Sequence, residues 1–123
     1  MKAEHFFTTE QDGLKQMWYG RIFMNPPYQG DLISQFVQKL CESPKVTEFV
    51  ILVNNATETR WFQVLLGMST AVCFPKGRVK FWHPRKIAVP LQGQAVLYFG
   101  NDLKAFRQEF NHFGAICHVQ RPL

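Results

Sequence analysis

RIFMNPPY, residues 21–28, begins as a short apolar strand and breaks at an Asn-Pro-Pro turn. Asp31 follows the break at a position that can cap a helix. Apolar residues of the next segment recur at helical period and form one stripe, made of Leu32, Ile33, Phe36, Val37 and Leu40. Pro44 marks the exit of that helix. We therefore expect a strand, a loop at its carboxyl end and an amphipathic helix.

EFVILV, residues 48–53, is the kind of near-continuous apolar run found in strands that are buried on both faces. Asn54 and Asn55 break this run, and Thr57 can cap the next helix. This second amphipathic helix carries Trp61, Phe62, Leu65 and Leu66. The order strand, helix, strand, helix predicts an α/β layered fold.

The second half of the chain has another pattern. Residues 71–74 and 79–82 are apolar runs on either side of PKGR, residues 75–78, which predicts a hairpin. Residues 94–99 predict a further strand, and residues 115–119 a last edge strand. Between these two, Leu103, Phe106, Phe110 and Phe113 line one face of a final helix. We expect a mixed sheet, with parallel strands first and antiparallel strands later.

Length and composition limit the classes of protein to which this chain can belong. The 123 residues suit a single domain over residues 1–123, and 46% hydrophobic residues with 12 Phe supply its core. The formal net charge of +5 is compatible with an acidic partner such as nucleic acid. The sequence has no signal-peptide pattern and no apolar run of membrane-spanning length, which predicts a soluble cytoplasmic protein.

The metal-ligating residue types are scattered. Cys41, Cys73 and Cys117 are far apart, odd in number and set in apolar runs, so we expect buried free thiols in a reducing cytoplasm. The four histidines are equally dispersed. No metal site is predicted.

Residues 25–28, NPPY, present groups that suit the methylation of an amino nitrogen. Asn25 Oδ1 is an acceptor, and Pro26 and Pro27 lack N–H groups and hold the chain extended. With the Pro26 carbonyl, Asn25 would accept both hydrogens of an exocyclic amino group and aim its lone pair at an electrophilic methyl group. Tyr28 would stack on a base taken out of the duplex. Positioning would supply most of the catalysis.

Two other interpretations of this tetrapeptide stay open. It can be a plain turn at the end of a strand, or a proline-rich ligand, although the spacer that such ligands usually need before Tyr28 is missing. The preceding strand and the following capped helix favour methyl transfer.

From about Ala3 to the C-terminus, several blocks resemble the phage-type adenine-specific DNA methyltransferases, often called the phage Dam-like family. They are FFT (6–8), DGL (12–14), NPPY (25–28), NNATETRWF (54–62), FPKGRVKFW (74–82) and QGQ (92–94), together with Trp18. The resemblance implies an α/β fold like that of class I S-adenosylmethionine-dependent methyltransferases, a Rossmann-like mixed sheet with flanking helices. It also implies S-adenosylmethionine as donor, adenine in DNA as acceptor, and a bacterial host with a phage or prophage gene.

The resemblance assigns roles to particular residues. Catalysis would fall to Asn25, Pro26, Pro27 and Tyr28. The donor would be bound by Asp12, Gly13 and Leu14 together with Asn25. An ordinary turn is the alternative for Asp12 and Gly13.

Basic and aromatic residues are interleaved in the expected hairpin. Lys76, Arg78 and Lys80 occur close to Phe81, a mixture that suits phosphate contacts and base stacking. Arg60 comes after the buried strand and could touch a phosphate. We hypothesise that these five residues bind DNA. The alternative is a solvated, charged hairpin with a hydrophobic underside.

Members of the resembled family begin with a further segment that contains an Asp-Pro stretch and resembles the donor-binding strand and loop. We expect this chain to lack those first strands. Such a partial domain would expose the edge of a central strand and hold half a cofactor pocket, which favours self-association or completion by a second chain. The alternative function is a catalytically inactive truncated remnant, at most a DNA-binding or assembly module. A further alternative is another acceptor, since the same tetrapeptide serves methyltransferases of glutamine and other amino nitrogens.

Overall fold

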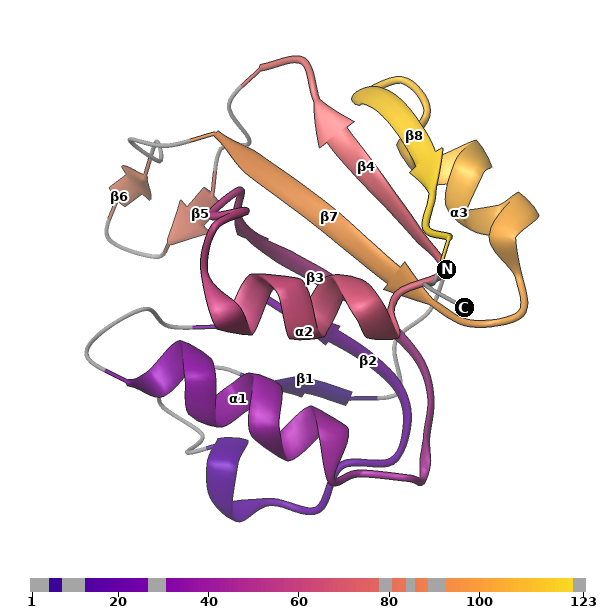
Figure 1. The fold of residues 1–123 in the computed structure, drawn as a ribbon. Coiled ribbons are helices and arrows are strands. Elements are labelled where there is room, and N and C mark those ends of the chain that lie inside the picture. Colours follow the sequence, from indigo (N-terminus) through magenta and orange to yellow (C-terminus); the bar gives the residue numbers. More distant parts are fainter. Residues whose placement is uncertain are drawn as a thin grey trace.

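The computed structural model describes residues 5–7, 13–26, 31–77, 81–83, 86–88 and 93–120. Their main sheet has six strands in the order β1-β2-β3-β7-β4-β8 (Figure 1). The strands are β1 (His5–Phe7), β2 (Gly20–Met24), β3 (Val46–Asn54), β4 (Ala71–Pro75), β7 (Gln94–Phe99) and β8 (Gly114–His118). β1, β2 and β3 are parallel, whereas β7 runs antiparallel to β3 and β4, and β8 antiparallel to β4. The predicted mixed α/β sheet is confirmed.

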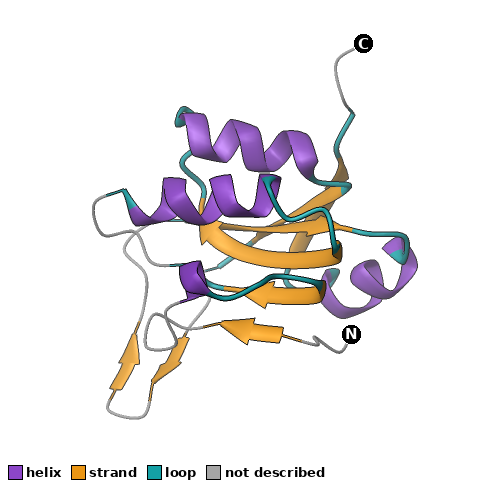
Figure 2. Ribbon diagram, turned by 90° about the horizontal axis from the view of Figure 1, so that it is seen from below, coloured by secondary structure: helices purple, strands orange, loops and turns teal. Residues whose placement is uncertain are grey.

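Helices cover both faces of this sheet. α1 (Leu32–Cys41) and α2 (Arg60–Met68) lie together on one face, and α3 (Leu103–Phe110) lies on the other (Figure 2). Successive side chains of a strand point to opposite faces. In β3, Ile51 and Val53 therefore pack with α1 and α2, while Val50 and Leu52 pack in the cluster that contains Phe106 of α3. Burial on both faces explains why the β3 sequence is apolar without a break.

The hairpin predicted around residues 75–78 is wrong. β4 pairs with β7 and β8, and not with the apolar run that comes after it. That run contributes β5 (Phe81–His83), which pairs with β6 (Lys86–Ala88) in a separate two-stranded sheet. Five of the six residues of β7 are buried, so β7 offers β4 far more apolar contact than a local turn could.

The helix starts differ from the prediction in detail. Thr59 caps α2 in place of Thr57: its Oγ1 accepts a hydrogen bond from Phe62 N at 3.3 Å and donates one to Ala56 O at 2.7 Å. Asp31 occupies the N-cap position of α1 as predicted, but its side chain makes no capping hydrogen bond. Asp102, to which the sequence pattern gave no role, caps α3 through Ala105 N.

β1 pairs with β2 from His5–Ile22 to Phe7–Met24 and forms one end of the described sheet. Two further expectations need correction. All three cysteines are free thiols, but only Cys73 is buried, while Cys41 and Cys117 are exposed. The final helix ends at Phe110, which leaves Phe113 exposed. Within the described ranges, no helix has the length and apolar character needed to cross a membrane.

Candidate active site

The carboxyl ends of β2, β3 and β4 share one edge of the sheet, because these three strands point the same way. We call it the carboxyl edge. Asn25 comes directly after β2 there, Asn54 ends β3, and Lys76 comes directly after β4. The antiparallel β7 begins at the same edge with Gln94, opposite Asn54. Ligands of open α/β sheets bind at such edges.

Asn25 is exposed at this edge, while the next residue, Pro26, is buried. Pro26 lines a small cavity between β2 and α1, together with Met24, Ile33 and Ile51 among others. A proline has no N–H to leave unpaired in such an apolar setting, and its ring fixes φ. The buried proline thus anchors the backbone that presents the Asn25 side chain to solvent. Pro27 and Tyr28 lie outside the described residues.

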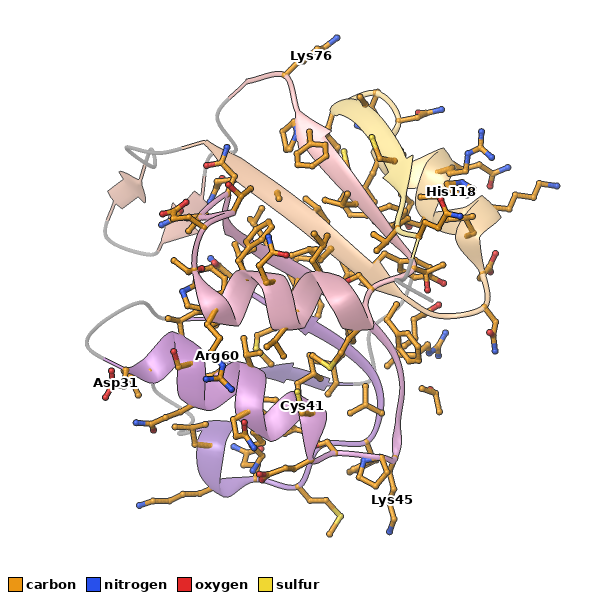
Figure 3. All side chains as sticks on the ribbon, in the orientation of Figure 1. Asp31, Cys41, Lys45, Arg60, Lys76 and His118 are labelled. Carbon is orange, nitrogen blue, oxygen red and sulfur yellow. The ribbon has the colours of Figure 1, made fainter. Side chains whose placement is uncertain are left out.

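The loop after β3 brings Arg60 to the same edge. Ala56 N and Thr57 N donate to the carbonyls of Asn54 and Asn55, both at 2.8 Å, and the Thr59 cap then starts α2. Arg60 is therefore the first helical residue, and its side chain is exposed. Figure 3 shows Asp31 and Arg60 at the starts of α1 and α2, and Lys76 beyond the end of β4. A guanidinium beside a helix N-terminus suits an anionic group such as a phosphate.

Gln94 is the polar side chain at this edge to which the sequence pattern gave no role. It is only 5% exposed, and its Oε1 has no hydrogen-bond partner. Gly93, the residue before it, lies so close to Asn55 that an added Cβ would meet Asn55 Nδ2 at 2.7 Å. Two sequence signals could have drawn attention to it: Gln94 ends the block QGQ (92–94) of the family resemblance, and it precedes the apolar run AVLYF.

The small β5–β6 sheet lies beyond the carboxyl edge, on the side of the main sheet away from α1 and α2 (Figures 1 and 2). Phe81, one of the expected DNA contacts, is the first residue of β5. Lys76 is exposed on the segment that leaves β4 in that direction. Arg78 and Lys80 fall outside the described residues. The expected DNA-binding residues that can be placed, Arg60, Lys76 and Phe81, each lie at or beyond the edge that carries Asn25.

The expected donor-binding residues lie beside α1. Asp12 is outside the described residues, and Gly13 opens the 3-10 turn η2 (Gly13–Lys15). Leu14 is half-buried, and its carbonyl accepts a hydrogen bond from Lys39 Nζ at 2.6 Å, in the last turn of α1. Leu14 also lines an open depression of about 620 Å³ with Asp31, Ser34 and Gln35 among others.

The opposite edge of the sheet carries the perturbed titratable group. The hydroxyl of Tyr98, a fully buried residue of β7, donates to Glu48 Oε2 at 2.8 Å and accepts from Asp102 N at 2.8 Å. Burial raises the pKa of Tyr98 above its usual range, and the hydrogen bond to Glu48 raises it further. Burial likewise raises the pKa of Cys73. Neither group lies at the carboxyl edge, so we interpret both as structural.

No cluster of three or more His, Cys, Asp or Glu that could hold a metal occurs among the residues that the structure places. Comparison with known proteins gives one family. The family model described as Dam, DNA N-6-adenine-methyltransferase, matches residues 1–118. No curated protein and no solved structure matches the chain. The matched range contains all the strands that form the carboxyl edge.

Proposed function

Because the chain belongs to the family of DNA N-6-adenine-methyltransferases, we propose that it transfers a methyl group from S-adenosylmethionine to the amino nitrogen of an adenine extruded from DNA. The observation that carries this proposal is the position of Asn25 and Pro26. They come directly after a parallel strand, at the edge of an α/β sheet where ligands bind. The sheet order also supports assignment to the class I, Rossmann-like methyltransferase fold.

Asn25 and Pro26 would hold and orient the acceptor. Asn25 Oδ1 and the Pro26 carbonyl accept the two hydrogens of the amino group, so its lone pair points away from them. The buried Pro26 ring keeps both acceptors in place before the base arrives, which lowers the entropy cost of alignment. As the new N–C bond forms, the nitrogen becomes positively charged, and it then loses one proton to water.

The donor supplies, when bound, a methyl carbon that leaves its sulfonium sulfur as that C–S bond breaks. The nucleoside part of such a molecule would lie in the depression beside α1. Leu14 provides an apolar contact for a ring, and Asp31 provides a carboxylate of the kind that accepts hydrogen bonds from ribose hydroxyls. Ser34 and Gln35 add polar groups on the same side.

DNA would approach from the side of β5 and β6. Arg60 and Lys76 are exposed at the carboxyl edge and would neutralise phosphates. Pro27 with Tyr28, Asp12, Arg78, Lys80 and Phe81 complete the proposed site, as the family resemblance implies. Phosphate contacts of this kind position the duplex, while the extruded base is held by Asn25 and Pro26.

The proposal is tested by transfer of a labelled methyl group from S-adenosylmethionine to adenine-containing DNA. We expect Asn25→Ala to lower the rate by roughly 100-fold or more, since it removes one of two acceptors that position the amino group. The matched control is Asn101→Ala, an exposed asparagine in the turn after β7, at the opposite edge of the sheet. This control should keep the wild-type rate.

Donor binding measured by calorimetry separates the proposal from its rival. Saturable binding of S-adenosylmethionine, with transfer that depends on Asn25, supports the enzyme. A folded chain that neither binds the donor nor transfers a methyl group contradicts the proposal and supports the inactive remnant.

A further inference from the structure

Gln94 holds a polar group that the fold itself does not use. The residue is only 5% exposed, and its Oε1 has no hydrogen-bond partner. A buried amide oxygen without a partner costs stability, and such atoms are rare in folded proteins. By contrast, the hydroxyl of Ser69, the other buried polar residue of the described chain, donates to Leu65 O at 2.8 Å. The side-chain amide of Gln94 is therefore available to a partner from outside the fold.

The face on which Gln94 lies is set by the register. Val96 and Tyr98 pack in the α3-side cluster, so Gln94, two residues earlier, points to the same face. Asn54 is directly opposite Gln94 and lies in line with Val50 and Leu52 of that cluster. This face is also the one toward which β5 and β6 lie (Figure 2).

Asn25 belongs to the same face. Phe23 packs against the α3-side cluster, and the residue before a proline is held extended, so Asn25 repeats the orientation of Phe23. Pro26 then turns to the α1 side, where it is buried. Gln94 is thus two strands away from Asn25 across β3, at a lateral separation of roughly 10 Å.

A base that contacts both Asn25 and Gln94 must span this separation. A base whose amino group is held at Asn25 and Pro26 extends away from them. In adenine, the acceptor farthest from the amino group is the ring nitrogen on the opposite side of the six-membered ring. Apart from the amino group, the edges of adenine offer only ring nitrogens as acceptors. Rotation of the Gln94 amide by 180° places Nε2 inward as the matching donor.

We propose that Gln94 positions the extruded adenine by hydrogen-bonding a ring nitrogen of the base, at the far end from Asn25. The inference rests on the proposed function only in that the carboxyl edge binds adenine. It requires neither the donor nor methyl transfer. Gln94 is therefore a positioning residue that touches the base.

Oligonucleotides with altered adenines test this directly. Single-stranded dA12 would be compared with 12-mers of 1-deaza-, 3-deaza- and 7-deazaadenine, each of which lacks one ring nitrogen but keeps the amino group and the stacking surface. For the wild type, we expect one of the three to bind about fivefold more weakly than dA12, as for one lost hydrogen bond. For Gln94→Met, which keeps the length of the side chain without its amide, that difference should vanish.

Thermal unfolding of the free protein provides the second readout. Because Gln94→Met removes a buried amide whose oxygen has no partner, its melting temperature should rise by roughly 2–4 °C. Ser69→Ala is the matched control at a buried polar residue that has its partner, and its melting temperature should fall. A role of Gln94 in stability alone would instead lower the melting temperature of Gln94→Met.

Three outcomes overturn the inference: no binding of dA12 by the wild type, the same deaza pattern in wild type and Gln94→Met, or a lower melting temperature for Gln94→Met. Nitrogen-dependent binding that is lost in Gln94→Met supports it, even where no methyl transfer occurs. That last result would contradict the proposed enzyme and leave adenine recognition in place.

Discussion

The carboxyl edge and the opposite edge of the sheet differ in whether their polar side chains have hydrogen-bond partners within the fold. At the edge opposite to the carboxyl edge, Tyr98 hydroxyl bonds both Glu48 and Asp102 N, and Thr70 Oγ1 accepts from Gly100 N at 3.3 Å. At the carboxyl edge, Asn25 is exposed and Gln94 Oε1 is buried without a partner. Hydrogen bonds closed within the fold stabilise it, whereas groups left open cost stability and are available to a ligand. The difference supports, independently of any motif, the proposal that the carboxyl edge binds the ligand.

The largest effect on stability is expected at Gly100, which lies at the edge opposite to the carboxyl edge and is tightly packed. At Gly100, φ is +157° and an added Cβ would meet Tyr98 Oη at 2.5 Å and Glu48 Cγ at 2.8 Å. We expect Gly100→Ala to lower the free energy of unfolding by about 3 kcal/mol, because the clash displaces the Tyr98 network. Urea unfolding measures this loss.

Gly67→Ala is the matched control, because nothing lies within 4 Å of the added Cβ on the exposed face of α2. This control should be stabilised by roughly 0.5–1 kcal/mol, as is usual when alanine replaces glycine inside a helix. Equal losses of unfolding free energy in the two variants would show that tight packing around Tyr98 does not distinguish this edge from the rest of the protein.

An intermediate effect is expected for Tyr98→Phe, which removes the hydroxyl shared by Glu48 and Asp102 N. We expect a loss of about 1–2 kcal/mol in the free energy of unfolding at neutral pH. The pKa of Tyr98 is raised in the folded state, so its contribution is full below the unfolded pKa of about 10 and is lost as pH rises further.

Unfolding measured from pH 7 to pH 11 checks the sign. The wild type should lose stability above about pH 10, and Tyr98→Phe should lack that part of the loss. The raised pKa of Cys73 adds a loss of the same sign that begins at lower pH and stays in both proteins. A steeper loss in Tyr98→Phe would contradict the assignment.

The smallest effect on stability is expected at the carboxyl edge. Arg60→Ala changes an exposed side chain at the first position of α2, so its melting temperature should match that of the wild type. Its affinity for DNA should fall about threefold, and the dependence of binding on salt concentration should become shallower by roughly one phosphate contact. An unchanged salt dependence would remove Arg60 from the DNA-binding surface.

The sequence predicted the elements better than their pairing. The strands around residues 21–24 and 48–53 and both amphipathic helices are consequences of local periodicity, and the structure confirms them. The pairing of β4 with β7 joins residues that are more than twenty positions apart, so no local turn signal could reveal it. Thr57 and Thr59 carry the same hydroxyl, and only the path of the loop at Ala56 decides between them.

In the candidate site, too, local sequence predicted some residues, whereas others depend on long-range contacts. Asn25 and Pro26 were predicted from a motif and its flanking strand, and the structure places them at the carboxyl edge. Gln94 becomes a candidate only through its burial and its position opposite Asn54. Neither property can be predicted from residues 92–94 alone. Whether these residues bind adenine stays a prediction.

The position of β7 also governs when the sheet can be completed during synthesis. β7 lies between β3 and β4, although it begins at residue 94, after both of them. Until it emerges from the ribosome, β3 and β4 each keep an apolar strand edge without its partner. Such long-range pairing slows folding and leaves edges open to aggregation. We therefore expect the nascent chain to depend on chaperones until its last third is translated, and then to close the sheet in one cooperative step.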